Sequence, residues 1–228
     1  MGRRLANPEA AGMAPRTSKT REPRQNDPER TKADILEIAT EEFAAHGLTG
    51  ARVDTIAERT RTSKRMIYYY FGGKEGLYQS VLEKAYADTR AREAELRLDE
   101  LEPPVALRRL VESTFDYDEE NPHFIRLVAI ENINHARYIA QSKAIRAMNA
   151  GAIATLAAIL KRGQDAGVFK AGIDPTDLHM MISAFCFFRV SNRYTFREVF
   201  GIDMSAAAFH HRHREMIGAT ILAYVGVN

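Results

Sequence analysis

The stretch TSKRMIYYYFGGKEGLY, residues 62–78, decides how the N-terminal part of the chain folds. Ser63 is a good N-cap residue for a short helix, and the glycine pair that follows Phe71 ends that helix. Ile67 and Phe71 are four residues apart on one face, so both can pack against a core. The helix then presents two cations and two tyrosines to its surroundings: Lys64, Arg65, Tyr68 and Tyr69.

Two more helices are indicated before this one. Asp27-Pro28 is a helix start signal, and Gly47 is suited to end the amphipathic helix that follows. A short apolar pattern around Ile56 marks a second helix, and a brief polar break separates it from the third. Three helices over residues 28–73, the last two short, form the helix-turn-helix arrangement, whose last helix lies in the major groove of DNA. The alternative is a solvated, charged helix beside a packed aromatic cluster.

The charge of the chain is nearly balanced, with 32 basic and 30 acidic residues. This balance argues against a generally polybasic nucleic-acid protein but leaves room for a local basic site. Residues 1–76 carry 14 basic and 11 acidic side chains, a net charge of +3, whereas residues 77–228 carry −1. Residues 1–27 are basic and poor in large apolar side chains, so we expect a disordered tail. The alternative is a basic arm that contacts the DNA backbone or the minor groove.

Several classes of protein are disfavoured by what the sequence lacks. Its single cysteine, Cys186, allows no internal disulfide, and no secretory signal or long apolar run is found. We therefore expect a cytoplasmic protein that does not enter a membrane. Nucleotide-binding loops and zincin motifs are absent from the sequence, so we expect no enzyme activity, no cofactor and no metal.

The three helical segments together resemble the TetR family of bacterial transcriptional regulators. The resemblance covers roughly residues 30–80, and the run YYYF with a lysine three residues later is its most specific part. The matching stretches are ILEIATEEFAAHG, VDTIAERT and TSKRMIYYYFGGKEGLY. The resemblance implies a three-helix DNA-binding domain, residues 28–76, and a larger helical domain, residues 77–228, that dimerises and binds a small ligand.

The resemblance also implies which residues contact DNA. The cap residue Ser63 would touch phosphate, the next three residues would face base edges, and Lys74 would bind phosphate at a helix N-terminus. The full expected set is Arg52, Thr62, Ser63, Lys64, Arg65, Met66, Tyr68, Tyr69 and Lys74.

Two positions depart from the family pattern. Arg52 stands where the family commonly has the Ser or Thr cap of the second helix, so this cap is lost or moves to another residue. Arg61 stands where the turn usually has glycine, and a non-glycine residue with positive φ costs about 1 kcal/mol. Either the turn adapts or Arg61 accepts the strain.

The rest of the chain reads as further helices with no convincing strand, which gives an all-α fold of about nine helices. The indicated segments are residues 74–98, 104–120, 123–135, 138–166, 174–192 and 205–225. The helix that starts at Asp174 is apolar almost all round, which favours burial on two sides, one of them a subunit interface. A homodimer would suit a palindromic operator, and the alternative is the central core helix of a monomer.

Polar residues that interrupt apolar helix faces predict an effector pocket. Arg189 suggests an anionic, partly apolar effector, or it neutralises Glu131. The alternative is an ordinary core in which an ion pair is satisfied. The predicted lining residues are Phe115, Phe124, Leu127, Glu131, Asn134, His135, Met148, Asn149, Phe185, Phe188, Arg189 and Asn192.

The function that these patterns favour is a transcriptional repressor that a small molecule releases from a palindromic operator, although an activator of the same family would look the same. One rival is a helical enzyme that acts on a small hydrophobic acid, with Glu131 and His135 as acid and base. The same pair, or the run at residues 210–213, could in principle bind a metal. A second rival is a DNA-binding dimer without a ligand.

Overall fold

The computed structural model describes residues 1–2 and 27–227, and within them the chain is all-α, as predicted. The predicted tail falls almost wholly on residues 3–26, outside the described residues. Ten α-helices form in the described part, where the sequence indicates about nine. They are α1 (Pro28–Gly50), α2 (Val53–Arg59), α3 (Lys64–Phe71), α4 (Lys74–Ala94), α5 (Pro103–Glu120), α6 (Pro122–Ile133), α7 (Lys143–Asp165), α8 (Pro175–Ser191), α9 (Arg193–Phe200) and α10 (Ala207–Val225).

In the first three helices, called the head below, α1 and α3 begin at their predicted caps, whereas α1 runs past its predicted end at Gly47. The Asp27 carboxylate accepts hydrogen bonds from the backbone N–H groups of Glu29 and Arg30, at 3.0 and 3.2 Å. Gly47 has φ +64° and interrupts α1, and one further turn continues to Gly50. The Ser63 side chain caps α3 by accepting from the N–H of Met66, at 3.2 Å.

The structure shows how the chain accommodates both departures from the family pattern. Arg61 adopts φ +54°, so it accepts the strain that a glycine would avoid. The Arg52 side chain makes no cap hydrogen bond. Instead, the buried Glu42 carboxylate accepts the backbone N–H of Arg52 at 2.9 Å and ties the start of α2 to α1.

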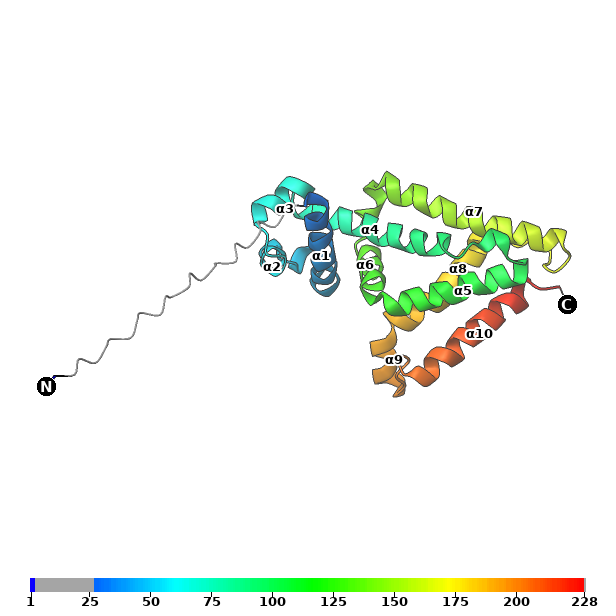
Figure 1. The fold of residues 1–228 in the computed structure, drawn as a ribbon. Coiled ribbons are helices and arrows are strands. Elements are labelled where there is room, and N and C mark those ends of the chain that lie inside the picture. Colours follow the sequence, from blue (N-terminus) through cyan, green and yellow to red (C-terminus); the bar gives the residue numbers. More distant parts are fainter. Residues whose placement is uncertain (3–26, 228) are drawn as a thin grey trace.

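The remaining helices form a bundle on one side of the head (Figure 1). α4 leaves the head and runs beside α7, and α5 packs against α7, α8 and α10. α6 lies between the head and the rest of the bundle and packs against α1. The C-terminus lies at the end of the bundle farthest from the head.

Two predicted segments form helices several residues shorter than expected, and one helix of the structure has no predicted counterpart. α4 ends at Ala94, and the 3₁₀ turn Leu98–Glu100 follows. α7 begins only at Lys143, where the Ser142 side chain caps the helix by accepting from the backbone N–H of Ile145 at 3.1 Å. α9 was not predicted. Its β-branched and aromatic residues have modest helix propensity, and none of its side chains is buried within the chain.

The buried apolar side chains form two cores. The head core includes Phe43, Ile56 and Ile67, and it continues into the bundle through Leu127 and Tyr138. The second core lies among α5, α7, α8 and α10. Since the first half of α4 belongs to the head core, the head is packed directly onto the bundle.

α7 is long and apolar enough to cross a membrane by length and composition alone. The sequence pattern did not indicate such a segment. In this structure α7 packs against α4, α5 and α8 as one helix of the bundle.

Replacing Gly76 by alanine should destabilise the protein, because an added Cβ would lie 2.0 Å from the carbonyl oxygen of Phe71. Relieving this clash requires α3 and α4 to move apart, which we expect to lower the free energy of unfolding by about 1–3 kcal/mol. Urea unfolding measures the loss. Gly151→Ala is the matched control, since nothing lies within 4 Å of its added Cβ and alanine favours a helix. Equal stability of the two variants would contradict the packing described here.

Candidate DNA-binding surface and effector cavity

The outer face of α3 is the candidate recognition surface. Tyr68 and Tyr69 are 42% and 77% exposed, and Lys64 and Arg65 are also exposed. Ile67, between them, is fully buried, and Phe71 packs partly against the same core. The helix therefore projects cations and phenols from a face that the core holds rigidly.

Other residues of the predicted DNA-binding set flank this face. Arg52 and Ser63 are exposed, whereas Thr62 and Met66 are half-buried. Lys64 Nζ lies 3.1 Å from the Asp54 carboxylate, and since both side chains are exposed this ion pair adds little stability. A DNA phosphate can take the place of Asp54.

Lys74 is placed differently from the other cations. Its Nζ donates to the carbonyl oxygen of Thr49 at 3.2 Å, so it joins the start of α4 to the end of α1. Two of its three N–H donors remain for a phosphate. The predicted role of Lys74 in DNA binding stays a prediction.

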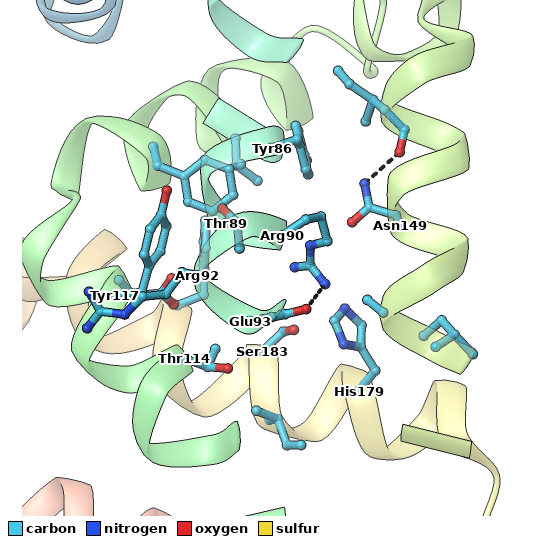
Figure 2. Close-up of a pocket in the computed structure, with 18 of the residues that line it drawn as sticks. Tyr86, Thr89, Arg90, Arg92, Glu93, Thr114, Tyr117, Asn149, His179 and Ser183 are labelled. Atoms are coloured by element: carbon cyan, nitrogen blue, oxygen red, sulfur yellow. Dashed lines mark hydrogen bonds and ion pairs between the residues drawn. The ribbon is translucent and has the colours of Figure 1, made fainter. Parts of the chain in front are cut away.

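A central cavity of about 580 Å³ opens among α4, α5, α6, α7 and α8. Figure 2 shows Arg90 reaching from α4 toward His179 of α8, with Asn149 on α7 nearby. Tyr86, Tyr117 and Phe124 contribute aromatic walls, and Tyr86 and Phe124 meet edge to face at 5.4 Å. The size and the apolar lining suit a small organic molecule.

Two of the twelve predicted lining residues, Phe124 and Asn149, line this cavity. The Asn149 amide donates to the Ile145 carbonyl at 2.9 Å, which leaves its oxygen free to accept. The other ten predicted residues lie elsewhere. Phe115 and Leu127 are buried in the cores, Met148 packs on the head core, and Asn192 ends α8.

Glu131 has a structural role in place of the predicted pocket role. Its carboxylate accepts from the Tyr78 hydroxyl at 3.0 Å and from the backbone N–H groups of Tyr138 and Ile139, at 3.0 and 3.1 Å. Burial, and after it the Glu131 charge, raises the pKa of Tyr78. The carboxylate thus joins α4, the end of α6 and the segment before α7.

Glu131 and His135 do not face each other as an i,i+4 pair on one helix. His135 has φ +57° and is exposed, because α6 has ended at Ile133. Together with Asn134, both residues border a second, more polar hollow of about 850 Å³ between the head and α6. Their placement gives no support to an acid–base pair.

Arg189 neither reaches the cavity nor neutralises Glu131. It is buried and pairs with Glu119 at 2.8 Å, donates to the Met204 carbonyl at 2.9 Å, and stacks over the Phe115 ring at 4.4 Å. It therefore joins α8 to α5 and to the segment before α10. The inference of an anionic effector cannot rest on this residue.

Phe185 and Phe188 point away from the cavity and are 40% and 48% exposed. Phe187, between them, lines it instead. Because α8 is apolar almost all round, its sequence pattern could not indicate which side faces the cavity.

The cavity contains charged groups that the sequence analysis missed. Arg90 Nη1 pairs with Glu93 at 2.5 Å, whereas the buried Nε of Arg90 has no partner in the described part of the chain. Burial, and then the charge of Arg90, lowers the pKa of His179. On α5, burial and then the charge of Glu119 raise the pKa of Asp118, which also lines the cavity, to about 7.

Helical spacing could have found two of these residues. Arg90 follows Leu82 and Tyr86 at four-residue steps, so it continues the buried face of α4. Asp118 follows Thr114 by four residues on α5 in the same way. Both stand in highly charged stretches, which read as solvent-facing.

The histidines of residues 210–213 occupy the first turns of α10. Among residues 1–2 and 27–227, no group of three histidine, cysteine or acidic side chains could hold a metal ion. Burial strongly raises the pKa of Cys186, so its thiol is a poor nucleophile.

Replacing Asp118 by asparagine should stabilise the protein at high pH. A raised folded-state pKa means that ionisation of this carboxyl opposes folding, so stability is complete below about pH 4 and is lost as the pH rises towards about 7. We expect Asp118→Asn to be more stable than the unaltered chain by about 1–3 kcal/mol at pH 8, with little difference at pH 4. Urea unfolding at both pH values measures this, and a difference independent of pH would refute it.

Comparison with known proteins agrees with this architecture. The family model "Bacterial regulatory proteins, tetR family" matches residues 35–81, and the model "Tetracyclin repressor-like, C-terminal domain" matches residues 103–221. The HTH-type transcriptional repressor NicS of Pseudomonas putida is 38% identical over 177 residues, which are 78% of this chain and 84% of that protein. The HTH-type transcriptional repressor SCO4008 of Streptomyces coelicolor is 34% identical over 158 residues, 69% of this chain and 77% of that protein.

Solved structures share the fold along most of the chain. The putative transcriptional regulator SCO4942 from Streptomyces coelicolor aligns with a TM-score of 0.64 and 25% identity, covering 86% of this chain and 98% of that one. The ketosteroid transcriptional regulator KstR2 of Mycobacterium tuberculosis aligns with a TM-score of 0.66 over 90% and 98% of the chains, and at 18% identity it shows the fold alone. The helix-turn-helix head, the helical bundle behind it and the family matches to both parts lead to one conclusion: the chain belongs to the TetR family of bacterial transcriptional regulators and binds DNA.

Proposed function

We propose that the chain is a cytoplasmic repressor that binds a palindromic operator as a homodimer and releases it when a partly apolar small molecule fills the central cavity. The observation that carries this proposal is the position of α4. Its first half belongs to the head core, and residues 86–93 of its second half line the cavity. A molecule that shifts the second half of α4 therefore acts on the orientation of the head.

The mechanism is a shift between two spacings of the paired heads. A ligand that binds better to the spacing that mismatches the operator half-sites lowers operator affinity. Linkage then requires that operator DNA weaken ligand binding by the same factor. The repressors NicS and SCO4008 support repression as the direction of regulation. We keep 28–76 as the DNA-binding region and 77–228 as the sensing and pairing region, and this boundary falls just inside α4.

An exposed apolar surface on α8, α9 and α10 supports the homodimer. Within the described residues, large apolar side chains gather here that nothing in the chain covers. α8 and α10 lie side by side, so their exposed faces can pair with those of a second copy. The members of this surface are Met180, Phe185, Phe188, Tyr194, Val199, Phe200, Met216 and Tyr224.

Placing charges on this surface should separate the dimer. In Phe188→Asp combined with Met216→Asp, four carboxylates would lie in one two-fold interface, so we expect a monomer at micromolar concentration and much weaker operator binding. Sedimentation velocity measures the mass. Val105→Asp, which changes a 54% exposed apolar residue on α5, is the control and should leave the dimer intact. A dimeric double variant would contradict the assignment of this surface.

Genome-wide mapping of binding sites tests the function directly. We expect a short palindrome upstream of a few operons, and a promoter fusion should become active when the chain is removed. Metabolites of the neighbouring operon are then tested for release of the bound fragment. Binding without any palindrome, or transcription that falls when the chain is removed, would refute the repressor proposal.

A further inference from the structure

We propose that the effector is a carboxylic acid whose apolar body also carries a hydroxyl or amino donor. Arg90 would bind the carboxylate and Asp118 would accept the donor. This inference rests on the proposed function, because it assigns the ligand class of the same cavity.

The Arg90 end of the cavity is built to receive an acceptor. Its side chain is 18% exposed, and its ion pair with Glu93 uses Nη1 only. The Nε donor is buried without a partner among the described residues, and no hydrogen bond of Nη2 is found among them. A buried donor left unpaired is costly, and the free Nε–Nη2 edge matches the two oxygens of a carboxylate.

The charges around this end favour an anion over a neutral acceptor. Three arginines line the cavity, Arg90, Arg92 and Arg146, against the acids Glu93 and Asp118. Arg92 faces Glu120, outside the lining, at 3.5 Å. His179 lies beside Arg90 (Figure 2), where burial and the charge of Arg90 keep the imidazole neutral. A carboxylate bound here would pair with Arg90, and Glu93 is the fixed negative charge with which it would compete.

The Asp118 carboxyl, in contrast to Arg90, lacks a hydrogen-bond donor. This carboxyl is 6% exposed and lines the cavity, and no hydrogen bond or ion pair of its side chain is found among the described residues. Ser113, on the preceding turn of α5, is also buried at the cavity wall. Buried polar groups without a partner are rare in proteins, and an O–H or N–H of a bound molecule would satisfy the acceptor.

Arg90 and Asp118 line the cavity from different helices, α4 and α5. The rest of the lining is mainly apolar and aromatic, and it includes Phe124, Val128, Leu156 and Ile182. The cavity therefore combines two polar sites with a mainly apolar wall.

Two sets of three probes separate the contributions of these features. The rigid set is 4′-hydroxybiphenyl-4-carboxylate, biphenyl-4-carboxylate and 4-phenylphenol; the flexible set is 8-hydroxyoctanoate, octanoate and 1-octanol. In at least one set, we expect calorimetric titration of the full-length dimer to show the hydroxy acid binding at least tenfold more tightly than either relative with one polar group. Within each set, the probe that binds most tightly should also raise the Tm of the protein most.

Variants assign each polar group to its residue. Arg90→Met should weaken both acids at least tenfold and leave the alcohol or phenol unchanged, and Arg90→Lys should restore part of the loss. Asp118→Ala should remove the advantage of the hydroxy acid over the plain acid, and Asp118→Asn, which keeps an acceptor, should retain part of it. Arg109→Met and Asp99→Asn change exposed residues outside the cavity lining and serve as controls.

Each result decides the proposal. The proposal fails if none of the four acids binds, or if the phenol or alcohol of each set binds as tightly as the acids. It also fails if Arg90→Met weakens all three probes of a set equally. It also fails if an amine lacking a carboxylate, such as 4-phenylbenzylamine, binds best. Operator release is measured separately: a probe that binds with this selectivity but leaves the operator bound upholds the ligand class and refutes the effector mechanism.

Discussion

Replacing Lys64 and Tyr68 together by alanine should lower the affinity for operator DNA at least 100-fold while leaving the protein folded. Both side chains are exposed on α3, whereas Ile67 of the same helix is buried in the head core. A good base contact contributes about 1–3 kcal/mol, and the proposed homodimer would lose two such side chains in each of its two heads. Mobility-shift titration at a fixed salt concentration measures the loss.

Lys161→Ala is the control for this result. It removes a more exposed cation on α7, outside the head, and should leave operator affinity unchanged. Undiminished binding by the double variant, with normal circular dichroism, would remove the assignment of α3 as the recognition helix. An equal loss in the control would mean that only total charge matters.

Replacing Glu131 by alanine should destabilise the protein by about 3 kcal/mol or more. Three donors, the Tyr78 hydroxyl and two backbone N–H groups, would lose their common acceptor inside the protein. Each buried donor left unpaired costs about 1–3 kcal/mol. For a chain of this size such a loss lowers the Tm by roughly 6–12 °C.

Two milder variants separate the contacts of Glu131. Tyr78→Phe removes only the hydroxyl contact, so it should cost about 1 kcal/mol, and Glu131→Gln keeps one acceptor for the backbone groups. Thermal unfolding of all three variants should give the order alanine, glutamine, phenylalanine from most to least destabilised. A Glu131→Ala variant as stable as the unaltered chain would show that the carboxylate is not needed to hold this junction.

The head could be predicted in detail because its signals are local. Asp27, Ser63 and Gly47 act through backbone groups a few residues away, and the apolar spacing fixes which side of α3 is buried. At Arg61 the sequence indicated only that either the turn adapts or the residue is strained, and the structure shows the strain. The outward side of a short helix can be predicted from local spacing, without information on distant parts of the chain.

The cavity could not be predicted in the same way, because its lining comes from five helices whose packing depends on distant contacts. The sequence pattern suggested a pocket role for Glu131, because it does not reveal that the distant Tyr78 hydroxyl donates to this carboxylate. Arg189 likewise finds Glu119 on another helix. Conversely, Arg90 and Asp118 stand in charged stretches that resemble solvent-facing helix, and only the packing of α4 and α5 turns them inward.

The head core extends through α4 into α6 and the segment before α7, and this limits how the protein can be re-engineered. The head core continues into Leu127 and Tyr138, so a fragment cut at residue 76 would leave buried apolar surface uncovered. Transplanting such a fragment onto another regulator would also break the contact between α1 and α6. New operator specificity is therefore better sought by editing the outward side chains of α3 in place, and the smallest portable unit of this chain is the whole regulator.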